Sequence, residues 1–221
     1  MALVLLKPFW FQGYDILLEI LFAIIALLVA YYANKINKIA QTHESKLFAE
    51  GFFFITASYI LLAIINFAAI FALKTASIKS PVRISDLITL GEFGTVVSIS
   101  LFLIGIITLA YMTLHYRNKR IPILMIIPLL IALLLSHNKL FLFYIITAFL
   151  LVYITIYYIQ HYLKHKNLNT LLILLAFLLM FIAKVHFIIS LSEPLFYAIG
   201  HLFEFLGYGL ILISLVRVIK Q

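Results

Sequence analysis

The sequence contains no cysteine in its 221 residues. Disulfide bonds, thiolate-bound metals, iron–sulfur clusters and cysteine nucleophiles are therefore excluded. A metal bound by this chain must be held by histidine, carboxylate or backbone oxygen ligands. The sequence also lacks the GxSxG, HExxH, Walker and dinucleotide-binding motifs that mark common enzyme and nucleotide sites. No motif therefore names a reaction.

Charged residues are scarce. Only 11% of the residues are charged and 66% are hydrophobic, whereas soluble domains average about 25% charged and about 45–50% apolar residues. A soluble fold of this size could not bury so much apolar surface. Because one membrane span needs about 20 apolar residues, about seven transmembrane helices with short loops use nearly the whole sequence. We predict an all-α, polytopic transmembrane helix bundle, organised as a single domain with no room for a separate soluble one.

Apolar runs between charged, proline or glycine residues place the spans. They fall near residues 14–32, 47–72, 87–116, 121–136, 140–158, 171–191 and 195–216. The fourth is the shortest and contains Pro122 and Pro128, so a tilted or incomplete crossing is the alternative for this segment. The longest predicted loop, residues 74–87, is either a lid or a connector.

The basic residues predict the orientation. One side of the bundle carries the larger group: Lys35, Lys38, Lys46, Arg117, Lys119, Arg120, Lys164, Lys166, Arg217 and Lys220. Because cytoplasmic loops are rich in lysine and arginine, we expect the N-terminus outside and the C-terminus in the cytoplasm. The same distribution argues against nucleic acid as a partner. The Ile- and Leu-rich, cysteine-free composition is compatible with a multi-pass protein of a prokaryotic plasma membrane.

Polar residues inside the spans are the main indication of function. A charged side chain at a helix centre costs about 2.5–3.5 kcal/mol on insertion scales, so such groups usually face the bundle interior. On the last predicted span, Tyr197, His201, Glu204 and Tyr208 follow helical spacing and share one face. Together with polar residues in the outer halves of other spans, they predict an outward-facing pocket for a small ligand, a metal ion or a proton. Its predicted lining is Glu19, Asn66, Glu92, His186, His201, Glu204 and Tyr208.

The histidines leave alternatives open. His186, His201 and Glu204 are a candidate metal set, for a divalent metal or for a b-type haem between the two histidines. The alternative is that His201 and Glu204 bond each other or a nearby tyrosine and only lock the helix to its neighbours. Lys184 points to the opposite side from His186, and we expect it to reach the membrane surface or to pair with Glu193.

On the cytoplasmic side, His161 and His165 have the i, i+4 spacing that can bind a divalent metal. The neighbouring Lys164 and Lys166 indicate a solvated helix end, which is the interpretation we prefer. Glu44, near the start of the second span, suits the helix dipole there.

Three functions are compatible with these residues. The first, which we prefer because carboxylate, histidine and asparagine residues concentrate in the outer half, is a non-enzymatic sensor or a subunit of a larger membrane complex. It would contact a membrane-protein partner through its basic cytoplasmic loops. The second is a metal- or haem-dependent membrane enzyme with Glu19 as general base. The third is a small-solute or proton-coupled transporter that uses Glu19 and Glu204.

Overall fold

The structure is a computed structural model that describes residues 11, 13–76, 82–114, 118 and 120–220. The described residues form α-helices and no strand, which confirms the predicted all-α bundle. The helices are α2 (Tyr14–Ala40), α3 (His43–Ala76), α4 (Val82–Thr113), α5 (Arg120–Leu135), α6 (Lys139–His165), α7 (Leu168–Ile189) and α8 (Leu195–Lys220).

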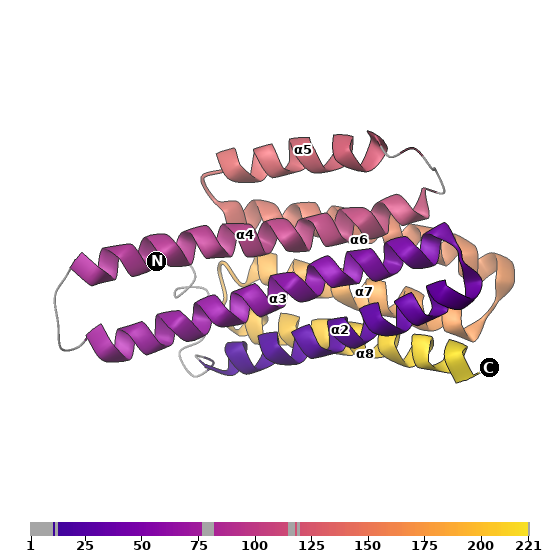
Figure 1. The fold of residues 1–221 in the computed structure, drawn as a ribbon, viewed down its shortest axis with the longest axis horizontal. Helices are drawn as coiled ribbons and strands as arrows, with labels where there is room; N and C mark the ends of the chain where they lie inside the picture. The colour runs from indigo at the N-terminus through magenta and orange to yellow at the C-terminus, as the bar shows by residue number, and fades with distance from the viewer. Residues whose placement is uncertain (1–10, 12, 77–81, 115–117, 119, 221) are drawn as a thin grey trace.

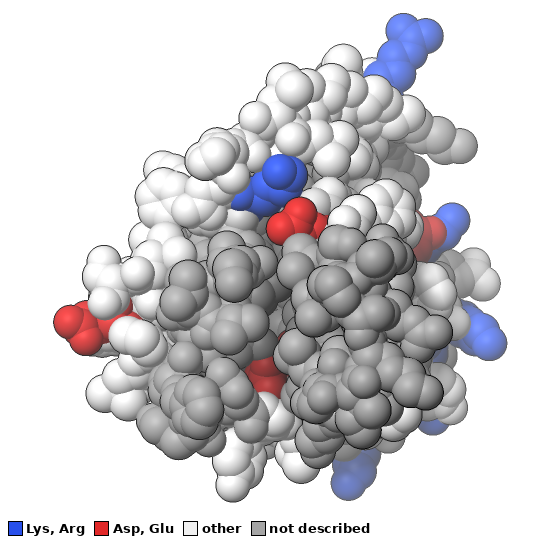
Figure 2. Space-filling model, turned by 90° about the vertical axis from the view of Figure 1, so that its left-hand side faces the viewer, with Lys and Arg blue, Asp and Glu red and all other residues white. Residues whose placement is uncertain are grey.

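Successive helices run in opposite directions along the long axis of the bundle (Figure 1). Consequently α2 and α8 begin at one end and finish at the other. The end where they finish carries basic residues of three helices, Lys38, Lys164 and Lys220 among them, and we call it the basic end. We call the other the opposite end. Figure 2 looks onto it, and the described residues that face the viewer there are mostly uncharged.

Six helices are long and apolar enough to cross a membrane, namely α2, α3, α4, α6, α7 and α8. The protein is therefore a multi-pass membrane protein. Several helices continue past the predicted limits of their spans. For example, α2 runs on to Ala40 and ends only at Gln41, whose φ of 49° is left-handed. The reason is that hydropathy marks where hydrocarbon ends, while residues such as Lys35 and Lys38 remain good helix formers in water.

The helix α5 is the exception in length. Its 16 residues span only about 24 Å at about 1.5 Å per residue, against a hydrocarbon core of about 30 Å. It nevertheless joins the end of α4 to the start of α6, which lie at opposite ends of the bundle, so it runs alongside the other helices (Figure 1). It packs at the edge against α4 and α6, and Leu133 is its one buried side chain among the described residues.

The predicted loop at residues 74–87 is wrong in most of its length. Residues 74–76 belong to α3 and residues 82–87 belong to α4, while residues 77–81 lie outside the described part of the chain. Both helices extend past their neighbours at the opposite end (Figure 1). Charged residues led to the loop prediction, but lysine and arginine do not interrupt a helix.

Small residues bring α3 and α4 into close contact. A Cβ atom on Gly105 would lie 2.7 Å from the carbonyl oxygen of Gly51, so only glycine fits at this crossing. Nearer the middle of the pair, the Ser58 hydroxyl donates to the Ser98 carbonyl oxygen (2.8 Å) and the Ser98 hydroxyl donates to the Ser58 carbonyl oxygen (2.9 Å). Close backbone approach and reciprocal hydrogen bonds commonly hold helices together in lipid, because burying apolar side chains there provides little driving force for association.

Candidate functional site

A buried ion pair joins α7 to α8. The Lys184 Nζ atom lies 2.6 Å from the Glu204 Oε1 atom, and the two side chains are only 3% and 2% exposed. The expectation that Lys184 reaches the surface or pairs with Glu193 is therefore wrong. The lysine side chain instead points into the bundle, and Glu193 is exposed. A residue two positions away on a helix faces nearly the opposite side, so His186 is the one of the two that turns away from Glu204.

Aromatic rings surround the Lys184 ammonium. Its Nζ atom lies 4.5 Å from the ring centroid of Phe102 on α4, 5.0 Å from that of Phe187 on α7 and 5.9 Å from that of Phe143 on α6. A cation over an aromatic face gains about 2 kcal/mol when it is desolvated. Side chains of four helices, α4, α6, α7 and α8, therefore surround this single positive charge.

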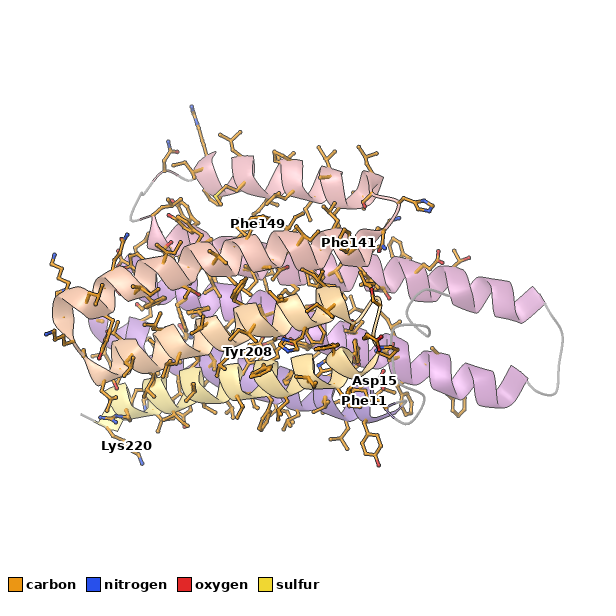
Figure 3. The ribbon with its side chains drawn as sticks, turned by 180° about the vertical axis from the view of Figure 1, so that it is seen from behind. Phe11, Asp15, Phe141, Phe149, Tyr208 and Lys220 are labelled. Carbon is orange, nitrogen blue, oxygen red and sulfur yellow. The ribbon has the colours of Figure 1, made fainter. Side chains whose placement is uncertain are left out.

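The Glu204 carboxylate faces polar groups on its other side. Its Oε2 atom lies 3.9 Å from the His201 Nδ1 atom, and it interacts electrostatically with the hydroxyl groups of Tyr59 and Tyr208. These two hydroxyls are linked, because Tyr208 donates to Tyr59 over 3.3 Å. Tyr208 is fully buried and lies in the middle of the bundle (Figure 3). The helical spacing thus placed His201, Glu204 and Tyr208 on one buried face of α8.

A second polar contact joins α2 to α3. The Asn66 side-chain amide donates to the Glu19 Oε1 atom over 2.6 Å, and the Glu19 side chain is buried. One turn earlier, buried Asp15 accepts a hydrogen bond from the Gly13 backbone N–H (2.9 Å). The structure therefore brings together two of the residues predicted for the pocket, Glu19 and Asn66.

Tyrosines and aromatic rings connect the two contacts. The carboxylates of Glu19 and Glu204 both interact electrostatically with the hydroxyls of Tyr144 and Tyr197. The ring of His201 lies nearly parallel to two phenylalanine rings of the N-terminal region, Phe11 and Phe22, at centroid distances of 5.9 and 5.7 Å. Phe11 and Asp15 lie beside each other at the opposite end of the bundle (Figure 3). The polar cluster thus runs from that end to the middle of the bundle.

Two residues predicted for the pocket lie elsewhere. Glu92 is exposed on α4. His186 is only partly buried, its Nδ1 atom lies 2.8 Å from the Ile182 carbonyl oxygen, and its ring contacts Phe196 and Phe203.

In these positions, His186, His201 and Glu204 do not converge on a common point where a metal ion could bind. Within the described ranges, no group of three or more histidine, aspartate or glutamate residues is placed to hold a metal ion. His186 is turned away from Glu204, while His201 lies between aromatic rings inside the bundle. A divalent metal or haem at His186 and His201 therefore has no support from this part of the structure.

Several members of the cluster were missed as site residues, Tyr59 and Lys184 among them. Tyr59 belongs to a polar stripe on α3 that looks, in sequence, like ordinary interhelical bonding. The buried position of Lys184 could have been considered from the sequence, because a lysine inside an apolar span must either reach the surface or find a partner. Glu204, twenty residues along the chain, is on the next antiparallel helix and at a depth that the long lysine side chain can reach.

These features define a class, the multi-pass integral membrane proteins built as helical bundles, here with a charged cluster inside the bundle. No protein-family model, curated protein or solved structure matches this chain.

Proposed function

We propose that this chain is a membrane sensor, alone or as a subunit of a larger membrane complex, whose ligand is a proton taken up at the Lys184–Glu204 ion pair. One observation supports this above all: both charges are buried inside a membrane-spanning bundle, 2.6 Å apart. Ionisable groups in such positions are costly to keep and are commonly functional. A buried ion pair is also weak as a stabilising device, because desolvation offsets most of its attraction.

A single proton would change this contact sharply. Protonation of Glu204 gives a neutral acid and leaves the Lys184 ammonium without a counter-ion among the aromatic rings. Removing one partner of a buried pair costs about 3–5 kcal/mol. A different packing of α7 against α8, in which the ammonium finds water, then becomes competitive. Proton binding thus shifts a population between two arrangements of the same helices.

The titratable groups around Glu204 come from several helices. They are Tyr59 from α3, Tyr144 from α6, Lys184 from α7, and Tyr197, His201 and Tyr208 from α8, with Glu19 of α2 reached through the shared tyrosines. From α4, the apolar ring of Phe102 lies against the Lys184 ammonium that Glu204 pairs with. Asp15, Glu19 and His201 lie on the side of Glu204 toward the opposite end. They are the groups through which a proton would arrive from that side.

A proton suits this site better than a metal ion or a small molecule. Side chains of α4, α6 and α7 enclose the ammonium, and a proton needs no cavity. The change in α7 and α8 would be transmitted along these helices to the basic end, where we expect the partner to bind.

Distance measurements between spin labels test this proposal. Because the chain has no cysteine, Lys164→Cys on α6 and Val218→Cys on α8 can be labelled specifically; both residues are exposed at the basic end. In lipid nanodiscs, we expect the distance distribution to change as the pH is lowered from about 9 to about 4, which raises the proton concentration about 10⁵-fold. Glu204→Gln should hold the low-pH distribution at every pH.

The matched control is Glu50→Gln, which removes an exposed carboxylate from α3 and should leave the pH response intact. A wild-type distribution that does not change with pH, or a Glu204→Gln variant that keeps the response, would overturn the proposal.

A further inference from the structure

A cavity of about 220 Å³, partly open to the surface, lies at the basic end. Its lining residues come from six helices, α2, α3, α4, α6, α7 and α8. The inner wall is apolar and includes the buried side chains of Phe48, Met112 and Leu215. The rim includes Glu44 and Tyr157.

The polar groups of this cavity are concentrated at its rim. Glu44 lies in the first turn of α3, is only partly exposed and interacts electrostatically with the Tyr157 hydroxyl. The Tyr157 ring lies nearly parallel to the ring of His161, with centroids 6.0 Å apart. With histidine neutral, Glu44 is the single formal charge among the described residues that line the cavity.

We propose that this cavity binds a small organic cation with an apolar body. The ammonium group would lie at the rim, against the Glu44 carboxylate and the faces of the Tyr157 and His161 rings, because carboxylates and aromatic faces both attract cations. The apolar body would point inward to Phe48 and Met112. An anionic ligand is disfavoured by Glu44, and a neutral apolar ligand would cover that carboxylate without pairing it.

The volume limits the size of the ligand. A cavity of about 150 Å³ accommodates benzene, whereas sites for drug-sized molecules begin at about 300 Å³. At 220 Å³, this cavity suits a molecule on the order of ten non-hydrogen atoms.

The cavity shares one face of α8 with the ion pair. Glu204, Tyr208, Ile211 and Leu215 follow helical spacing and are all buried. Leu215 lies about 16 Å along the axis from Glu204, at about 1.5 Å per residue. The two sites are therefore separate, and the groups that would pair the ammonium at the cavity, Glu44, Tyr157 and His161, are not those of the ion pair.

Binding of 2-phenylethylammonium tests the inference, with 2-phenylethanol as the uncharged molecule of the same size. Both are titrated calorimetrically into protein in nanodiscs, with empty nanodiscs subtracted to remove partition into lipid. We expect saturable binding of the cation and affinity for the alcohol roughly tenfold weaker or less, a difference of about 1.4 kcal/mol. Glu44→Gln should weaken cation binding by a similar factor.

The control variant is again Glu50→Gln, which changes net charge equally on the same helix but lies outside the cavity lining; it should bind the cation as wild type does. Glu44 is only partly buried, so its replacement leaves the core packing in place, and the unfolding temperature checks this. Equal cation affinity in Glu44→Gln and wild type, or no saturable binding above empty nanodiscs, would refute the inference. Glu44→Gln leaves the Lys184–Glu204 pair in place and should keep the pH response of the spin-label distances, which separates this result from that of the proton-sensor proposal.

Discussion

The Lys184 ammonium and the Glu204 carboxylate approach to 2.6 Å across two consecutive helices, and no other formally charged pair among the described residues is as deeply buried. The charge of the lysine is held by a carboxylate on one side and by three phenylalanine rings around it. In lipid, neither partner can turn to water without moving its helix. Under the proposed function, this pair couples the charge state of Glu204 to the packing of α7 on α8.

Glu204→Gln should lower the free energy of unfolding by about 3–5 kcal/mol, because it leaves a buried ammonium without a counter-ion. The double variant Lys184→Met/Glu204→Gln should recover most of this loss, since it removes the uncompensated charge. Unfolding of the detergent-solubilised protein, followed by circular dichroism, measures both. A double variant less stable than the single one would show that the ammonium is not what destabilises Glu204→Gln.

Asn66→Asp places a second carboxyl group where the amide donates to Glu19 at 2.6 Å. At neutral pH, two carboxylates this close repel, and the lost charged hydrogen bond alone costs about 1.5–3 kcal/mol. As the pH falls, one proton shared between the two carboxyls restores a hydrogen bond, so the loss of stability should shrink. Asn66→Leu has no such group, and its loss should depend little on pH. If Asn66→Asp and Asn66→Leu lost the same amount of stability at every pH, the Glu19–Asn66 contact would be contradicted.

Gly105→Ala should destabilise the α3–α4 pair by about 1–3 kcal/mol, the usual range for overpacking. The new methyl group would lie 2.7 Å from the carbonyl oxygen of Gly51, a backbone atom that cannot move aside alone. Gly209→Ala is the matched control, because a Cβ atom there meets nothing within 4 Å. The thermal midpoints of the two variants should differ accordingly; equal midpoints would mean that the two helices do not cross so closely.

His201→Ala tests the metal and haem alternatives directly. If His201 packs between aromatic rings and passes protons toward Glu204, as we propose, purified wild-type and variant protein should have the same metal content and the same visible absorption spectrum. Elemental analysis and absorption spectroscopy on gently purified protein provide the measurement. A stoichiometric metal or a haem band that disappears in the variant would instead favour a cofactor site on α8.

The architecture could be predicted largely from composition. Runs of about 20 apolar residues can only be helices in hydrocarbon, because no water is present to satisfy backbone groups. Such runs located α2, α3, α4, α6, α7 and α8. The loop at residues 74–87 was predicted wrongly because charge was taken to mark a loop, whereas α3 and α4 continue as helices beyond the apolar stretch. The orientation in the membrane stays a prediction from the basic residues.

The site could be predicted only in part. Helical spacing on α8 placed Glu204 and Tyr208 on one buried face, because positions along a single helix follow from its geometry. Spacing along one helix does not determine which other helices pack against that face.

By itself, the sequence determined that this chain is a membrane-spanning bundle and which of its residues are costly enough in lipid to need partners. Only the tertiary structure decided which partners meet. In α7, apolar residues occupy every side, so hydropathy does not fix how the helix is rotated. The rotation is set by packing, since a Cβ atom on Gly207 of α8 would lie 3.0 Å from the Ala176 carbonyl oxygen and 2.8 Å from Met180. That close approach turns Lys184, and not His186, toward Glu204.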